Sequence, residues 1–309
     1  MLRKQKSHNK LKRAAALGSI SLAITLCLLK GCGALVSGSL AVLSSMIDSL
    51  SDIIASVITY YAVKISGRPA SCDYRYGYGK VEALSALVQA MFIAMSGIFI
   101  FYDAVLRLAE KQVLQQTGIG LIIMIISMIL TVGLVIFQRY VARVTKSQAI
   151  LADSMHYSVD ILTNGAIILS LAVIKIWEIN WIDAVMAIMV AVYLLYSAAG
   201  LARDAVPLLL DKELSDDIRR NVANIIRSHR LHPEMHDLRT HDLGGIYMFE
   251  FHLELDGQLD LATAHSYTAE IEEMLQKEYP KAQIIIHQEP KGIEDERLDN
   301  HLASKRCKS

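Results

Sequence analysis

The sequence is short of charged residues, glycine and proline. Charged side chains make up 20% of the 309 residues, against about 25% in an average soluble domain, and there are only 17 glycines and 5 prolines. This composition excludes a disordered or collagen-like chain. Hydrophobic residues instead reach 53%, with a mean hydropathy of +0.35, so part of the chain is expected to lie in an apolar solvent.

Cysteine is equally scarce. The four cysteines form no Cys-x-x-Cys pair, and two of them lie in an apolar run: Cys27, Cys32, Cys72 and Cys307. Neither a disulfide framework nor a cysteine zinc finger is therefore expected.

The net charge of zero hides an uneven distribution along the chain. Residues 1–207 hold 18 lysines and arginines against 11 aspartates and glutamates, whereas the remaining residues hold 13 against 20. Eight of the ten histidines also follow Pro207. Two domains of different chemistry are therefore expected. Membrane-surface loops account for the basic residues of the first, so we expect no nucleic-acid partner.

The first half contains six apolar runs, each long enough for the roughly 20 residues of a membrane-spanning helix: residues 14–36, 40–65, 83–106, 116–140, 149–175 and 182–206. Residues 1–207 are therefore predicted to form an all-α, six-helix transmembrane domain. The first run follows a basic tail and could instead be a cleaved signal sequence. Against this, Lys30 stands where a cleavage site needs a small residue, and a second apolar run follows at once.

Basic residues favour one side of the membrane. With both termini in the cytoplasm, 14 lysines and arginines fall on the cytoplasmic side, in the N-terminal tail, the second and fourth connections and after the last run. Four fall on the other side: Lys30, Arg107, Lys111 and Lys175. This positive-inside bias predicts a multi-pass protein of the inner (plasma) membrane whose acidic C-terminal half is cytoplasmic.

Two of the apolar runs carry ionisable residues at matched spacing. Asp48 and Asp52 lie four residues apart in the second run, as do His156 and Asp160 in the fifth, so each pair occupies one helix face. An ionisable group at the bilayer centre costs roughly 2.5 to 3.5 kcal/mol. Facing helices would bring three carboxylates and one imidazole together, a ligand set for a zinc-like divalent ion.

Other interpretations of these residues stay open. The groups could hydrogen-bond between helices or sit near a membrane interface. Asp153 falls outside the paired pattern and is interpreted as polarity at a helix end or along an access path. Two intramembrane aspartates could also form an aspartyl protease, and Tyr102-Asp103 matches one of its motifs. No Gly-x-Gly-Asp follows on a later helix, however, and His156 would have no role, so an enzyme is not expected.

Two further segments accompany the Asp-x-x-x-Asp and His-x-x-x-Asp pairs: residues 69–70 (Pro-Ala) and residues 76–84 (Tyr-Gly-Tyr-Gly-Lys-Val-Glu-Ala-Leu). Together, these motifs resemble the cation diffusion facilitators, in particular their bacterial zinc and ferrous-iron efflux subgroup. The resemblance covers about residues 12–290. It implies a homodimer that exports divalent metal in exchange for protons. It also implies that Lys80 and Asp211 form a salt bridge that holds the dimer at the membrane surface.

One loop departs from this family's pattern. Where the family has a second site built from an aspartate and histidines, this chain has Ser71, Tyr74 and Tyr78. Cys72 and Asp73 alone make a poor site, so no metal is assigned to this loop.

The C-terminal half predicts a small α+β layer. Helices are expected over Leu210–Arg230, with Ser215 as N-cap, and over Leu261–Tyr279. Alternation of apolar and polar residues predicts strands over the segments Met235–His241, Ile246–Asp256 and Gln283–His287. The order αββαβ gives a ferredoxin-like cytoplasmic domain over residues 208–290. Residues 291–309 are expected to be a disordered tail.

The family resemblance also implies a cytoplasmic, binuclear zinc site that regulates the protein, built from His236, His252, His265, His287 and Glu289. Glu289 stands where the subgroup usually has aspartate, so its longer arm would alter the site. His241 is an extra candidate nearby, and no role is expected for His229, His232 or His301. Zinc is the expected cargo, although three carboxylates and an imidazole also accept iron, cadmium or manganese. A membrane metal sensor is the rival function, but no output domain is expected after residue 290.

Overall fold

A computed structural model describes residues 2–37, 40–110, 118–177 and 181–292, and it divides the chain into two compact units, Met1–Val206 and Pro207–Ser309. Of the predicted tail, only Lys291 and Gly292 fall within the described residues.

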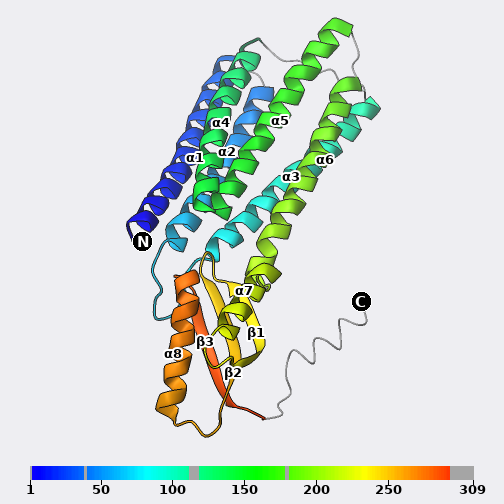
Figure 1. The fold of residues 1–309 in the computed structure, drawn as a ribbon. Helices are drawn as coiled ribbons and strands as arrows, with labels where there is room; N and C mark the ends of the chain where they lie inside the picture. Colours follow the sequence, from blue (N-terminus) through cyan, green and yellow to red (C-terminus); the bar gives the residue numbers. More distant parts are fainter. Residues whose placement is uncertain (1, 38–39, 111–117, 178–180, 293–309) are drawn as a thin grey trace. The chain divides into compact units, whose positions relative to one another are not determined.

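The first unit consists of long helices, and every predicted apolar run falls on one of them (Figure 1). They are α1 (Leu2–Ser37), α2 (Leu40–Ser66), α3 (Val81–Glu110), α4 (Gly118–Thr145), α5 (Gln148–Trp177) and α6 (Trp181–Leu209). Within the described residues, five helices are long and apolar enough to cross a membrane, namely all of these except α2. The prediction of a multi-pass membrane protein is thereby supported.

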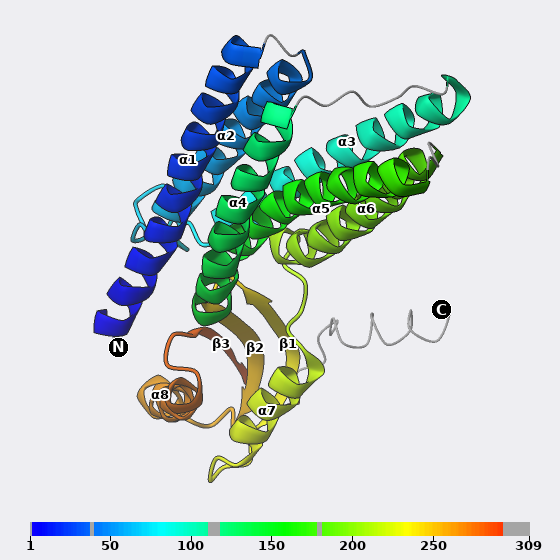
Figure 2. The same ribbon diagram turned by 90° about the horizontal axis from the view of Figure 1, so that it is seen from above.

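Small residues bring the helices of this unit close together. The buried cluster between α1, α2, α4 and α5 is lined by alanines, among them Ala15, Ala62, Ala142 and Ala149. Helix α3 packs against α2 and α5, and α3, α5 and α6 form one group of helices in Figure 2. Close packing of small residues is the usual means of helix association in lipid. Large side chains such as Ile129 and Ile136 of α4 point outward instead.

The second unit is an α+β layer of the predicted αββαβ order. It contains α7 (Asp216–Arg227), β1 (Glu234–Asp242), β2 (Tyr247–Leu255), α8 (Leu261–Glu278) and β3 (Gln283–Pro290). The sheet order is β1-β2-β3, with β1 antiparallel and β3 parallel to the central strand β2. Its core combines Phe249, Phe251 and Leu253 of β2 with apolar residues of both helices.

The predicted helix Leu210–Arg230 is wrong at its start. Helix α6 continues to Leu209, and the chain then turns at Asp211, whose φ is 53°. Glu213 bonds to β1 instead of entering a helix, because its Oε2 accepts hydrogen bonds from the amide and the hydroxyl of Thr240 at 3.0 and 2.5 Å. Helix α7 begins only after Ser215, which is the N-cap but makes no side-chain capping bond.

Strand β1 contains an irregularity that the alternation of residues did not predict. Its pairing with β2 shifts register between His236 and Arg239, and Asp237 has a φ of 54°. A bulge of this kind redirects the side chains that follow it. His236 therefore keeps its place opposite His252 while the rest of the strand is re-aimed.

Asp260 is the N-cap of α8, and it generates a prediction about pH. Its carboxylate accepts bonds from the hydroxyl and the amide of Thr263 at 2.6 and 3.0 Å, which lower the pKa of Asp260 below the ordinary aspartate value. The stability it contributes is therefore complete above the unfolded-state pKa and is lost as pH falls through the folded-state pKa.

Asp260→Ala is expected to accelerate hydrogen exchange in the first turn of α8 in the full-length protein at pH 7, because the amide of Thr263 loses its acceptor. Asp260→Asn is the matched control, since it keeps an acceptor oxygen that does not titrate. Between pH 6 and pH 3, thermal unfolding of the C-terminal unit should show a smaller acid-induced loss in Asp260→Asn than in the wild type. Equal losses would contradict this role of Asp260.

Candidate metal centres

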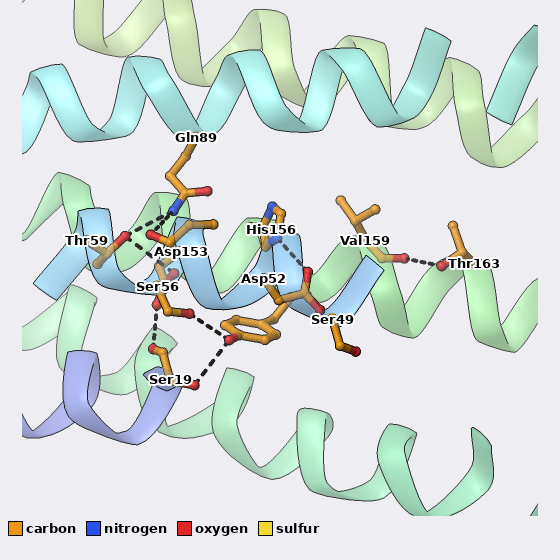
Figure 3. Close-up of polar contacts among 12 residues, drawn as sticks. Ser19, Ser49, Asp52, Ser56, Thr59, Gln89, Asp153, His156, Val159 and Thr163 are labelled. Atoms are coloured by element: carbon orange, nitrogen blue, oxygen red, sulfur yellow. Dashed lines mark hydrogen bonds and ion pairs between the residues drawn. The ribbon is translucent and has the colours of Figure 1, made fainter. Parts of the chain in front are cut away.

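The membrane unit brings two of the predicted ligands into contact. His156 Nε2 of α5 lies 3.1 Å from Asp52 Oδ1 of α2, and both residues are buried. The two side chains point toward each other between the helices (Figure 3). The other ring nitrogen of His156, Nδ1, is buried and has no hydrogen-bond partner among the described residues. A metal ion held jointly with Asp52 would bind Nε2, the ring nitrogen that faces this carboxylate.

The helical backbone places the remaining two predicted ligands near this pair. Asp160 lies one turn after His156 on α5 and is partly buried. Asp48 lies one turn before Asp52 on α2, but its side chain is outside the described part of the chain. Residues four apart share a helix face, so the backbone is compatible with a shared site for all four.

Asp153 does not lie at a helix end or along an open path, which corrects the interpretation drawn from the sequence. It belongs to α5, and its side chain is fully buried among the helices of the membrane unit. One carboxylate oxygen, Oδ2, accepts bonds from Ser19 Oγ at 2.5 Å and Gln138 Nε2 at 2.6 Å. The other, Oδ1, accepts a bond from Thr59 Oγ1 at 3.4 Å (Figure 3).

The second unit contains a group of metal-ligand type on one face of its sheet. Ligand atoms of His236, His252 and Glu289 all lie within 4.8 Å of one another. His252 Nδ1 is 2.6 Å and His236 Nε2 is 3.2 Å from the two carboxylate oxygens of Glu289. Strand register creates this group, because His236 of β1 is paired with His252 of β2, and Glu289 of β3 is paired with the residue two positions after His252 on β2.

The other predicted ligands of this site take different positions. His287 Nε2 lies 3.5 Å from Glu289 Oε1, but the His287 side chain is largely exposed. His265 is exposed on α8 and does not join the three-residue group found among the described residues. His241 Nε2 lies 3.7 Å from Asp211 Oδ1, so this histidine faces the linker after α6.

Glu254 is a member of this site that the sequence analysis missed. It is buried, and its Oε1 lies 3.3 Å from His236 Nδ1. Register places it between Glu234 of β1 and Glu289 of β3. Neighbouring like charges destabilise a sheet, so this row of carboxylates is suited to a cation. The alternation in β2, which put Glu254 on the same face as His252, was the signal that could have identified it.

His229 has a structural partner in place of a metal. Its Nε2 lies 3.1 Å from Glu270 Oε2, and Arg230 donates a second bond to Glu270 at 2.9 Å. The Arg230 guanidinium, and after it His229, hold the pKa of Glu270 below its usual range. This ion pair ties the end of α7 to α8.

Comparison with known proteins assigns both units. Residues 16–210 match the transmembrane domain of cation efflux proteins, and residues 214–291 match the cytoplasmic domain of the same proteins. This chain belongs to the cation efflux family. The family assignment confirms the resemblance noted in the sequence and identifies a transporter, not an enzyme.

Several relatives are similar to this chain over nearly its whole length. The cation-efflux pump FieF of Yersinia enterocolitica is 38% identical over 284 residues, which cover 92% of this chain and 94% of the relative. The pump of the same name from Escherichia fergusonii is 37% identical over 287 residues, which cover 93% and 95%. Similarity over both domains shows that the two units belong to one transporter.

The loop before α3, which departs from the family's pattern of metal ligands, contains aromatic contacts. Ser71 Oγ lies 2.9 Å from the hydroxyl of Tyr78, and the rings of Tyr74 and Tyr78 are 4.8 Å apart. Within the described residues, no three-ligand group includes Cys72 or Asp73.

The histidine–glutamate group of the sheet generates a prediction about zinc. In an Asp52→Ala background, which removes a predicted ligand of the membrane unit, zinc is expected to raise the unfolding temperature of the C-terminal unit. Ligand at 100 times its dissociation constant contributes about 2.7 kcal/mol. His252→Ala and Glu289→Ala should diminish this shift, whereas His232→Ala, on an exposed histidine outside the group, should retain it. Equal zinc shifts in all three variants would refute a metal site on this face.

Proposed function

We propose that the chain exports divalent metal ions across the inner membrane in exchange for protons. The observation that carries this proposal is the contact between Asp52 and His156 at 3.1 Å, buried between two helices of an apolar unit. Intramembrane ionisable residues mark ion pathways in transporters. Asp48, Asp52, His156 and Asp160 form the proposed transport site.

Proton exchange is a consequence of this ligand set. A metal ion binds neutral imidazole and ionised carboxylates, so its binding releases protons and protons on the far side can displace it. A protein that alternates between two conformations, each open to one side, then couples the two flows. We propose zinc as the main cargo because imidazole suits zinc, with iron and cadmium as further substrates.

The working form is proposed to be a homodimer with both termini in the cytoplasm. The excess of lysine and arginine on one side of the six runs supports this orientation. Following the family resemblance, Lys80 and Asp211 are proposed to form the salt bridge that holds the dimer at the membrane surface. We propose that residues 1–207 carry out transport and that residues 208–290 regulate it. In the second segment, resident zinc would be held by His236, His252, His265, His287 and Glu289.

Asp160→Ala is expected to abolish zinc uptake into proteoliposomes under a proton gradient, because removing one of four ligands leaves a weak site. The wild type should accumulate zinc with a counterflow of protons. Thr163→Ala, one turn further on α5, is the matched control, since its hydroxyl bonds to the backbone of its own helix. Dimer assembly should be unchanged in both variants. Zinc flux at the wild-type level in Asp160→Ala would exclude this residue from the site.

Asp48→His is expected to preserve zinc transport while reducing cadmium transport. The change converts a site with three oxygens and one nitrogen into one with two of each, and imidazole suits zinc, whereas carboxylate oxygen suits harder ions such as manganese. A second imidazole would also tighten a site that otherwise admits the larger cadmium ion. Zinc and cadmium uptake should be measured side by side in the same vesicles, and an unchanged ratio of the two would refute this role of Asp48.

A further inference from the structure

A polar seam joins α2 and α5 along several turns. Three side-chain contacts follow one another along it, with donor–acceptor distances of 3.1, 2.7 and 3.4 Å: Asp52 with His156, Ser56 with Tyr157, and Thr59 with Asp153. The two ends of the seam run in opposite directions along the helices, since Asp52 pairs with His156 and the later Thr59 pairs with the earlier Asp153. The pair of the proposed transport site is one end of this seam, and Asp153 is the other (Figure 3).

Asp153 also connects the seam to the rest of the unit. Its Oδ2 binds Ser19 of α1 and Gln138 of α4, which are hydrogen-bonded to each other at 2.7 Å. Its partner Thr59 in turn accepts a bond from Gln89 of α3 at 3.0 Å. One buried carboxylate thus bonds directly to three other helices and, through Thr59, to a fourth.

The register of α2 against α5 decides whether the ligands meet. One helical turn is about 5.4 Å, whereas metal–ligand bonds are about 2 Å long, so a slip of a fraction of a turn would separate Asp52 from His156. A carboxyl group buried among apolar helices requires its hydrogen-bond partners. Asp153 therefore resists any slip that would take it away from Thr59, Ser19 and Gln138.

We infer that Asp153 is a positioning residue of the transport site, which fixes the register of α2 against α5 by bonding α1, α2 and α4 to α5. It touches no metal in this role, and it acts through the helices that carry Asp52 and His156. The inference rests on the proposed function, since it concerns the ligands of the same site.

The test exchanges donor and acceptor across one bond. Asp153→Asn keeps only one of the two acceptor oxygens, too few for the three donors of Ser19, Gln138 and Thr59. It is expected to raise the KM for zinc uptake about tenfold or more, in line with the loss of a hydrogen bond to a charged group, with a smaller change in maximal rate. The double variant D153N/Q138E restores the bond with its polarity reversed. It should return the KM to within about threefold of the wild-type value, which is a recovery of most of that bond.

Two further variants, Ser154→Ala and Thr59→Val, keep the test decisive. Ser154→Ala, at the neighbouring position where the hydroxyl bonds to its own helix at Leu151, should leave the KM unchanged. If D153N fails to assemble, Thr59→Val removes one bond of Asp153 without changing its charge and should still raise the KM. The inference would be overturned by an unchanged KM in D153N or, where D153N cannot be assayed, in Thr59→Val. It would also be overturned if Q138E did not restore the KM that D153N raises. Failure of the wild type to take up zinc would instead reject the proposed function.

Discussion

The membrane unit depends on one constraint, which is that every ionisable group between apolar helices must find its partner on another helix. Each such group costs roughly 2.5 to 3.5 kcal/mol at the bilayer centre. Asp52 meets this requirement through His156, and Asp153 meets it through Ser19, Gln138 and Thr59. These contacts can all be made only in one register of α2 against α5, so the constraint that makes the polar residues costly also fixes the geometry of the candidate site.

The C-terminal unit fixes its candidate ligands by a different kind of register. Main-chain pairing of three strands aligns His236, His252 and His287 in one row and places Glu254 beside Glu289 in the next. The bulge after His236 keeps this residue opposite His252 while the rest of β1 is redirected. In this unit main-chain pairing determines the positions of the candidate ligands, whereas in the membrane unit contacts between polar side chains determine them.

The sequence was informative wherever a pattern is local to one element. Apolar length predicted the six helices, spacing of four put Asp48 with Asp52 and His156 with Asp160 on single faces, and alternation predicted β2. The partners of Asp153 are serine, threonine and glutamine, which carry no periodic signal and come from three other helices. The turn at Asp211 was equally hidden, because Glu213 bonds to the distant Thr240 and so overrides the local preference for helix.

The two candidate centres also differ in how easily their ligands can separate. Asp52 and His156 lie on different helices whose seam consists of a few side-chain contacts, so a modest tilt of α2 against α5 would change the distance between them. His236 and His252 lie on neighbouring strands held by main-chain hydrogen bonds, and moving them apart would break the sheet. A site that must release its ion suits the first arrangement, and a site that retains its ion suits the second. This difference supports the proposal that metal is cargo between the helices and a resident on the sheet.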